Sequence, residues 1–284
     1  MPDVAGDARP RAGLRLRWRR LRRDPGLAVL IALLSTALVF GGIAWAVVHA
    51  PNWPLVQADF FSPHWFADAW PALVKGFWTN VRLFMICEAL VLVFALVLAI
   101  LRSLPGPVFF PIRLLVTIYT DVFRAVPGIL VIYILGFGIP GLQLPGVPRD
   151  PFFWAVVALT LLYSAYVSEV YRAGIESIHP SQEAAARSLG LSRLQALRYV
   201  VVPQAVRRVI PPLLNDFIGL QKDTVLVSFL GVVEIFRAST IKQTAHFNFT
   251  PYLASALVFL ILVLPLARLT DWLVARDRAR GANR

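Results

Sequence analysis

Charged residues are scarce in this sequence. They make up 15% of its 284 residues, against about 25% in soluble domains, whereas hydrophobic residues make up 58%. There is one cysteine, Cys87, so an internal disulfide is excluded. The composition excludes an ordinary soluble domain and indicates an integral membrane protein.

Patterns of catalytic chemistry are missing as well. The sequence contains no G-x-x-x-x-G-K-[ST] phosphate loop, no H-E-x-x-H zinc motif and no G-x-S-x-G nucleophile elbow. Its histidines, His49, His64, His179 and His246, are scattered along the chain. We therefore expect no catalytic residue, no metal site and no cofactor in this chain, so that energy for any work must come from a partner.

Six apolar segments are long enough to cross a bilayer, which takes roughly 20 residues at about 1.5 Å each. The predicted spans are Leu27–Ala50, Thr79–Leu101, Ile112–Phe137, Phe152–Ala173, Val209–Val232 and Pro251–Leu273. The first is predicted to be a retained anchor, because its apolar run is about twice the length of a signal-peptide core. The expected fold class is all-α, a polytopic membrane protein with six transmembrane helices.

Basic residues predict the orientation, because Lys and Arg gather on the cytoplasmic side of membrane proteins. The tail before the first span holds eight arginines. The first two predicted outer loops, Pro51–Trp78 and Gly138–Pro151, contain one Lys and one Arg between them, and the third, Val233–Thr250, adds Arg237 and Lys242. We predict that both termini are cytoplasmic. The net charge of +12 is then explained without a nucleic-acid partner, and none is expected.

One long polar segment, "SQEAAARSLGLSRLQALRYVVVPQA" from Ser181 to Ala205, interrupts the apolar chain after the fourth span. Pro180 suits a first helical turn, and Gly190 is a typical helix stop. Ser192 and Gln195 form an S-x-x-Q capping box that starts a second helix, which we expect to run to Pro203. The pattern predicts two short helices with an abrupt turn at the cytoplasmic surface.

The first of these helices is rich in small side chains, at Ala184, Ala185, Ala186 and Ser188. Small side chains let another backbone approach, and Glu183 and Arg187 add polar contacts at the edge. Docking onto a separate protein is one interpretation. An interfacial amphipathic helix packed against its own bundle is the other, and the residues alone leave both open.

The segment resembles the cytoplasmic EAA loop of permease subunits of ATP-binding-cassette (ABC) importers. The family pattern is EAA, three residues, Gly, nine residues, then aliphatic, any residue, aliphatic and Pro. Here Gly190 is followed after nine residues by Val200, then Val202 and Pro203. The family's EAA falls on Ala184 to Ala186, so Glu183 stands one position early, about 100° around the helix.

Further motifs are similar to the polar amino acid (His/Glu/Gln-type) branch of these permeases. Its E-x-x-R-x-G-I-x-S-I run is carried by Glu169, Arg172, Gly174, Ile175, Ser177 and Ile178. Shorter matches are "GFWTNVRL" at Gly76, "VFRAVP" with Phe123, Arg124 and Pro127, an LPLLN-like stretch with Pro211, Pro212 and Asn215, and a KDTSL-like stretch with Lys222, Asp223, Thr224 and Leu226. Val225 departs from the usual Ser, and Ala125 and Val126 replace Gly and Thr. The resemblance covers about 200 residues, from Gly76 to the C-terminus, and leaves the first span outside a five-helix core.

The resemblance implies a permease that moves polar amino acids across the cytoplasmic membrane, driven by a separate ATPase subunit. The ATPase would dock on a coupling helix formed by Gln182, Glu183, Ala184, Ala185, Ala186, Arg187, Ser188, Leu189 and Gly190. Implied partners are an ABC ATPase dimer that binds ATP and Mg²⁺, a second permease of the same or a different kind, and an extracytoplasmic substrate-binding protein. Alternatives are a permease for an amino-acid-like osmolyte, a secondary transporter or channel that works without ATP, and a membrane-anchored assembly protein.

Four regions are expected along the chain. Residues 1–25 form a basic cytoplasmic tail, and residues 26–75 an extra transmembrane helix with an external loop. Residues 76–276 form the permease core, with the coupling loop at about 178–205, and residues 277–284 a C-terminal cytoplasmic tail.

Charged and polar residues inside spans are costly and so mark a candidate translocation pathway. The candidates are Glu88, Asp121, Arg124, Asn215, Asp216, Lys222 and Asp223. In span five, Asn215, Gly219 and Lys222 recur at helical spacing, either lining a path or pairing locally, as Lys222 could with an acidic residue of another helix.

The remaining candidates carry similar alternatives. Asp121 and Arg124 could pair on one helical face, and Pro127 predicts a kink nearby. Glu88 could meet a substrate amino group or pair with Arg124.

Overall fold

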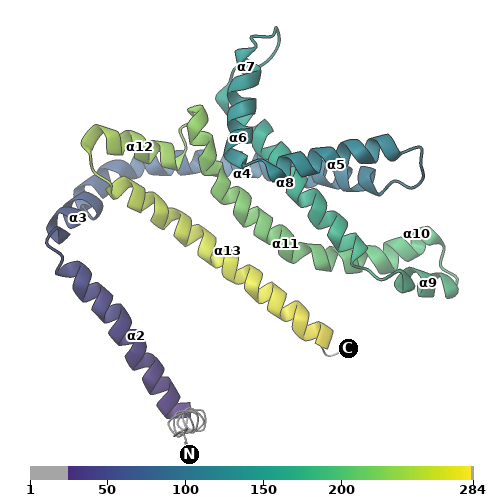
Figure 1. The fold of residues 1–284 in the computed structure, drawn as a ribbon, viewed down its shortest axis with the longest axis horizontal. Helices are drawn as coiled ribbons and strands as arrows, with labels where there is room; N and C mark the ends of the chain where they lie inside the picture. The colour runs from purple at the N-terminus through teal and green to yellow at the C-terminus, as the bar shows by residue number, and fades with distance from the viewer. Residues whose placement is uncertain (1–24, 283–284) are drawn as a thin grey trace, which may run out of the picture. The chain divides into compact units, whose positions relative to one another are not determined.

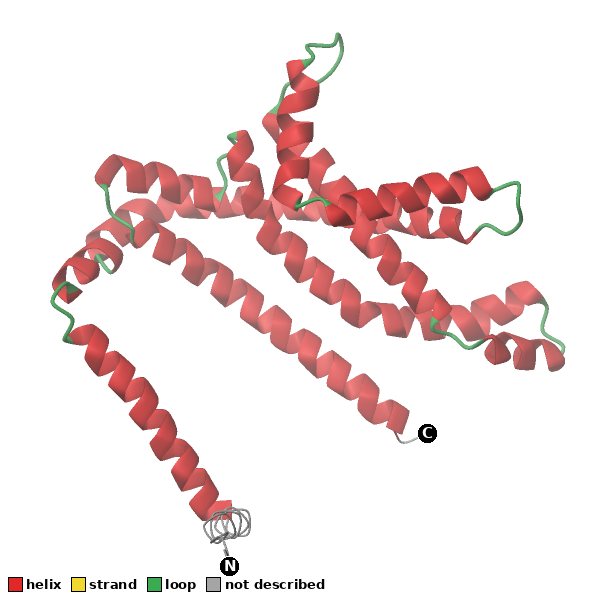
Figure 2. Cartoon of the chain, in the orientation of Figure 1, coloured by secondary structure: helices red, strands yellow, loops and turns green. Residues whose placement is uncertain are grey.

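The computed structural model describes residues 25–282, and side chains for residues 26–276. The described residues form helices joined by loops (Figure 2), which confirms the expected all-α class. The predicted basic tail, apart from Pro25, and residues 283–284 lie outside the described residues. The chain divides into two compact units, Met1–Ala58 and Asp59–Arg284.

The first unit contains α2 (Pro25–Val48) and most of α3 (Trp53–Phe60). Helix α2 matches the predicted first span. Its described side chains are apolar on every side and exposed within the unit, which is typical of a helix surrounded by lipid.

The second unit begins with α4 (Pro63–Ser103), which is much longer than the predicted second span. The predicted external loop Pro51–Trp78 is mostly helical, because α3 and the first part of α4 occupy most of it. Pro71 does not end the helix, since Ala69 and Leu73 on either side of it are fully buried in one apolar cluster with Ile235, Ala238 and Ala254. Tertiary packing here overrides the tendency of proline to break a helix.

The predicted third span is broken rather than kinked. Helix α5 (Phe110–Ala125) ends before Pro127, and the chain resumes with α6 (Gly128–Tyr133), the π-helical η1 (Ile134–Gly138) and α7 (Ile139–Gly141), at 109° to α5. Pro127 disfavours helical backbone in the residue before it, and Val126 is accordingly extended (ψ 130°).

The next helices are α8 (Pro151–Glu176), α9 (Pro180–Ser188) and α10 (Arg193–Ala196), followed by the π-helical η2 (Leu197–Val201), α11 (Val202–Asp223) and the 3₁₀-helical η3 (Thr224–Leu230). The prediction that the second short helix runs to Pro203 was wrong: helix continues from Arg193 to Leu230. The wider turn of η2 places Pro203 in the first turn of α11, where its missing N–H is not needed.

The chain ends with α12 (Ile235–His246) and α13 (Thr250–Ala282). The predicted outer loop at Val233–Thr250 is mostly helical, since α12 occupies most of it. Glu234 caps this helix by accepting hydrogen bonds from the backbone N–H groups of Phe236 (2.9 Å) and Arg237 (2.6 Å).

Four helical stretches among residues 25–282 are long and apolar enough to cross a membrane: Gly26–Val48, Trp53–Ser103, Pro151–Glu176 and Thr250–Arg276. Two bent pairs meet the same test together, α5 with Gly128–Gly141 and Arg193–Leu230 with α12. If each bent pair is one span, the described chain has the six spans that were expected.

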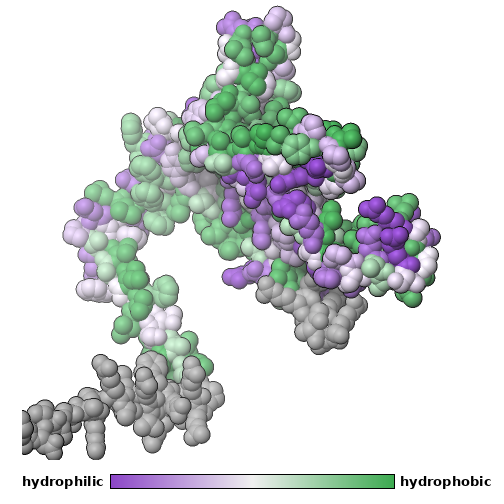
Figure 3. Space-filling view, turned by 45° about the vertical axis from the view of Figure 1, so that its right-hand side comes forward, coloured by the Kyte–Doolittle hydropathy of each residue, from purple (hydrophilic) through white to green (hydrophobic). Residues whose placement is uncertain are grey.

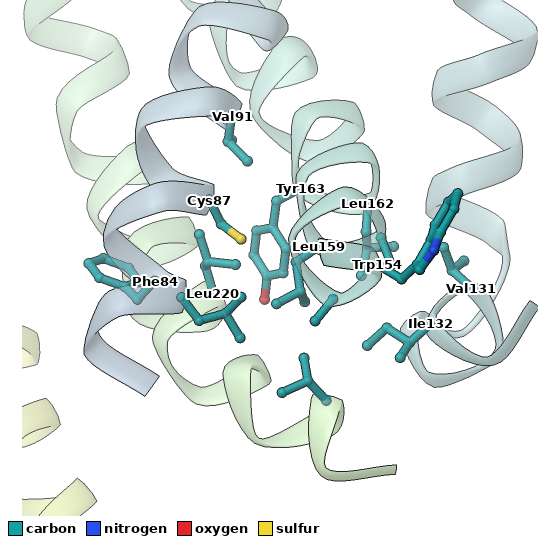
Figure 4. Packing of buried hydrophobic residues seen from close by; sticks show 14 of the residues in the cluster. Phe84, Cys87, Val91, Val131, Ile132, Trp154, Leu159, Leu162, Tyr163 and Leu220 are labelled. Atoms are coloured by element: carbon teal, nitrogen blue, oxygen red, sulfur yellow. The ribbon is translucent and has the colours of Figure 1, made fainter. Parts of the chain in front are cut away.

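The main core lies where α4, α8 and α11 pack together. Figure 1 shows α8 and α11 side by side, both leading to α9 and α10. Figure 4 shows Cys87 of α4, Leu159 and Tyr163 of α8, and Leu220 of α11 in this core. The core therefore fixes the two helices that carry the polar segment.

A buried polar junction joins α4, η3 and α12. The Asn80 amide donates to Thr224 Oγ1 (3.0 Å) and to Glu234 Oε2 (3.2 Å), and Asn80 Oδ1 accepts from the backbone N–H of Ile235 (3.0 Å). Asn80, Thr224 and Glu234 are fully buried. One turn before Asn80, a Cβ at Gly76 would lie 2.7 Å from the backbone carbonyl carbon of Glu234, so only glycine lets the two helices meet here.

Gly76→Ala is expected to lower the stability of the folded chain by about 1–3 kcal/mol, because backbone atoms cannot move aside as a flexible side chain would. Thermal unfolding of the detergent-purified variant measures this. Gly141→Ala, where an added Cβ meets nothing within 4 Å, is the matched control and should unfold like the parent. Equal unfolding temperatures for both variants would contradict the close approach at Gly76.

Candidate functional site

Helices α9 and α10 form a capped hairpin, which we call the elbow (residues 180–196). Gly190 has φ +89°, and the backbone N–H of Leu191 donates to Ala186 O (3.3 Å), as in a left-handed helix stop. The capping box is confirmed: Ser192 N–H donates to Gln195 Oε1 (2.9 Å), and Gln195 N–H donates to Ser192 Oγ (3.3 Å). The turn is thus held by its own hydrogen bonds.

The elbow presents small and apolar side chains outward. Ala184, Ala185 and Ser188 are exposed, as are Gln182, Arg187 and Gly190, while Ala186 is buried within the hairpin. Leu189 and Leu194 are 86% and 75% exposed. A hollow of about 600 Å³ lies between the helices, lined by residues that include Arg187, Arg193 and Gln195.

Glu183, which stands one position before the family's EAA, has a partner inside the elbow. Its Oε1 lies 3.7 Å from Arg193 Nε of α10. The pair is partly exposed and so contributes little to stability. Its side chain is nevertheless directed at the second helix of the elbow.

The elbow is joined to the bundle through the motif at the end of α8. At Gly174 any side chain would overlap Val209 of α11, so the two helices approach closely there. The Ser177 carbonyl accepts a hydrogen bond from Arg208 Nη1, and Ile178 packs in a buried cluster with Val201 and Ala205. The G-I-x-S-I part of the motif therefore fixes the base of the elbow.

The first half of the same motif forms a chain of ion pairs. Glu169 pairs with Arg102 at the end of α4 and, at 2.7 Å, with Arg172 Nη2, while Arg172 Nη1 lies 2.5 Å from Glu176 Oε2. Arg102 also donates to Thr120 Oγ1 of α5 (3.4 Å). These contacts tie α4, α5 and α8 together beside the base of the elbow.

A pocket of about 480 Å³ opens between α5, α8 and α11. We call it the inner pocket, because it lies at the end of α8 that leads into the elbow. Arg124 and Asp216, two of the predicted pathway residues, line it together with Tyr166, Glu169 and Arg208. Asp216 Oδ2 is buried and has no hydrogen-bond partner among residues 25–282. The pocket therefore brings a carboxylate and a guanidinium to the same cavity.

Several pairings that the sequence left open as alternatives are not found in the described part of the chain. Asp121 and Arg124 are both exposed and form no ion pair with each other, and Lys222 is exposed with no acidic partner. Glu88 does not pair with Arg124, but lies close enough to Asp216 for the two carboxylates to interact.

Asn215 and Lys222 are exposed on α11, as residues that line a translocation path must be. Figure 3 shows hydrophilic residues gathered on the central part of the molecule between apolar surfaces, and again over the elbow. The predicted pathway residues are thus partly brought together, at Glu88, Arg124 and Asp216.

Tyr163 and Glu234, which hold polar groups of the bundle in place, were missed from the sequence. The Tyr163 hydroxyl donates to Asp223 Oδ2 (2.8 Å), and a Cβ at Gly219 would lie 3.2 Å from that hydroxyl oxygen. Gly219 therefore makes room for Tyr163. Glu234, which completes the polar junction, was also missed. It is an isolated acid between the apolar residues Val233 and Ile235, and that isolation was the available signal.

Comparison with known proteins agrees with this geometry. Residues 106–278 match the family described as "Binding-protein-dependent transport system inner membrane component". The probable glutamine ABC transporter permease protein GlnM of Bacillus subtilis (strain 168) is 33% identical over 213 residues, which cover 74% of this chain and 94% of that protein. The inner membrane amino-acid ABC transporter permease protein YhdY of Escherichia coli (strain K12) is 31% identical over 277 residues, 92% of this chain and 72% of that protein.

A solved structure is similar as well. It is described as the crystal structure of an amino acid ABC transporter with histidines, and aligns with a TM-score of 0.67 and 29% identity over 74% of this chain and 96% of that chain. Permease subunits of this kind are not enzymes themselves. The chain therefore belongs to the inner membrane components of binding-protein-dependent transport systems, as a membrane-spanning permease subunit of the amino-acid ABC importers.

Proposed function

We propose that this permease passes polar, zwitterionic amino acids through the inner pocket, and that a separate ATPase drives it through the elbow. One observation carries the substrate class: Arg124 and the unpartnered oxygen of Asp216 line the same pocket. Opposite charges in the lining of one pocket complement the carboxylate and ammonium of one amino acid. Relatives named as glutamine, arginine and glutamate permeases support the same class.

The elbow supplies the docking surface for the ATPase. Residues Gln182 to Gly190 form a rigid helix whose small side chains Ala184, Ala185 and Ser188 face outward, so another backbone can come close. The neighbouring Leu189 and Leu194 are exposed apolar side chains suited to a socket on the partner. ATP and Mg²⁺ bind to the ATPase dimer, and this chain holds no cofactor.

Exposed polar side chains argue for a second permease. Asp121, Asn215 and Lys222 lie on predicted spans and are exposed in the single chain. Facing lipid, each charge would cost about 2.5–3.5 kcal/mol on insertion scales. A second permease, identical or related, covers this face and encloses an aqueous path. An extracytoplasmic binding protein delivers the amino acid, and the elbow and both termini lie in the cytoplasm.

The complex tests this proposal. The chain, its ATPase and a substrate-binding protein are reconstituted in liposomes, and ATP hydrolysis and uptake are followed with single L-amino acids. We expect hydrolysis and uptake to rise together with at least one polar amino acid. Uptake by the chain alone, driven by an ion gradient without ATP, would instead support a secondary transporter. ATP-driven uptake of an osmolyte but of no amino acid would keep the assignment to the ABC importers and contradict the proposed amino acid substrate.

A further inference from the structure

A second pocket lies at the opposite end of the Arg193–Leu230 helix from the elbow. It has a volume of about 430 Å³ and lies between η1, η3, α12 and α13. Its lining includes Phe137, Ser228, Phe229, Phe236, Arg237 and Tyr252. None of these residues belongs to the predicted translocation pathway. We call it the outer pocket, because an elbow in the cytoplasm puts it on the external side.

The outer pocket holds polar groups that nothing in the described chain uses. Arg237 is exposed, and its guanidinium forms no ion pair with any residue from 26 to 276. Ser228 is only 5% exposed, yet its Oγ has no hydrogen-bond partner there. A buried hydroxyl without a partner costs free energy unless a ligand or water satisfies it. A guanidinium presents paired N–H donors that match the two oxygens of a carboxylate.

The other walls are aromatic. Phe137, Phe229 and Phe236 remain 51%, 49% and 37% exposed, and the Phe236 ring lies 5.4 Å from the Tyr252 ring. Aromatic faces bind apolar stems and attract ammonium groups. No acidic residue lines the pocket. Arg237 is the one charged residue in the lining, so a charged ligand group that binds there must be an anion. The combination fits a small molecule with one carboxylate and a stem of a few carbon atoms.

We propose that the outer pocket binds an α-amino acid by its carboxylate, through Arg237 and Ser228, with the side chain against the aromatic rings. The inference rests on the proposed function, because it takes an amino acid as the solute. It adds a first binding site on the external side, separate from the inner pocket at Asp216. The amino acid released by the binding protein meets Arg237 before it reaches the path.

The single buried cysteine makes the site testable by thiol labelling. In a Cys87→Ala background, Thr240→Cys places a reporter in the lining of the outer pocket, and Arg149→Cys places one at the same end of the bundle, in the loop before α8. The full chain in liposomes is treated with a membrane-impermeant maleimide on the external side. The probes are millimolar L-glutamine, L-histidine and L-arginine, and the carboxylate-free amine that each becomes on loss of its α-carboxylate.

We expect at least one of the three amino acids to slow labelling of Thr240→Cys about tenfold or more, as occupancy above nine-tenths predicts. Its decarboxylated amine should give no protection, and labelling of Arg149→Cys should not change. Adding Arg237→Gln to the Thr240→Cys reporter should remove the protection, whereas Arg237→Lys should keep part of it. The control Arg149→Gln should keep all of the protection. Phe229→Cys is a second reporter in case Thr240→Cys disturbs folding.

Three results would overturn the proposal: no protection by any of the amino acids, equal protection by the amines, or protection unchanged by Arg237→Gln. Failure of the proposed function looks different. If ATP drives amino acid uptake but no amino acid protects Thr240→Cys from labelling, only the outer site is contradicted. If an amino acid protects Thr240→Cys but ATP drives no uptake, only the proposed function is contradicted.

Discussion

Ala185→Trp is expected to abolish retention of the ATPase subunit while the permease still folds and inserts. Ala185 is exposed on α9, so a tryptophan there breaks no internal contact, but it fills the space that a docked backbone must occupy. Steric exclusion of this kind removes most of the affinity of a helix-in-groove interface, a loss of about 100-fold or more. Co-purification of the complex and ATP-driven uptake measure the effect.

The matched controls come from the same helix. Ala185→Ser keeps a small side chain and should retain the ATPase. Glu183→Ala should cost only a few-fold, because Glu183 is directed at Arg193 within the elbow. A larger loss for Glu183→Ala than for Ala185→Trp would show that docking depends on that carboxylate, and would contradict docking through small side chains.

Asp216→Asn and Arg124→Gln are each expected to lower amino acid uptake about tenfold to hundredfold, with the ATPase still bound. Each change removes one charged partner of the zwitterion, and a hydrogen bond to a charged group is worth about 1.5–3 kcal/mol. Both side chains line the inner pocket and have no ion-pair partner in the described chain, so the loss should come from the ligand and not from the fold. Uptake of the best amino acid at several concentrations gives the size of the effect.

Asp271→Asn is the control for that experiment. Asp271 is an exposed acid on α13 that lies outside both pockets, near Arg268. Its loss should leave uptake unchanged. Normal uptake in Asp216→Asn and Arg124→Gln, or an equal loss in Asp271→Asn, would remove the inner pocket from the path.

Local signals in the sequence were sufficient for much of the fold. Gly190 and the Ser192–Gln195 box predicted the elbow correctly, because caps act through neighbouring residues alone. The first part of α4 was missed, although Ala69, Leu73, Gly76 and Asn80 repeat at helical spacing, since Pro71 and the polar residues around them suggested a loop. Pro203 was taken as a helix end because a π-helical turn leaves no mark in composition.

The site was less accessible to sequence reasoning, because its partners are far apart along the chain. Arg124 and Asp216 were each predicted as intramembrane charges, but only the packing of α5 against α8 and of α8 against α11 puts them in one pocket. The pairings of Asp121 with Arg124, and of Lys222 with an acid, were weighed as alternatives to lining a path, because charges in a span often satisfy one another. The exposed faces of α5 and α11 leave them available to another subunit or to water.

If the helical stretch from Arg193 to Leu230 moves as one body, it acts as a lever. It is roughly 55 Å long, and it approaches α8 closely at Gly174 and Val209, between its two ends. With that contact as a fulcrum, a tilt of about 10° at the elbow would swing the far end, beside Arg237, by roughly 5 Å in the opposite direction. A push at one membrane face would thereby widen or narrow the opening at the other.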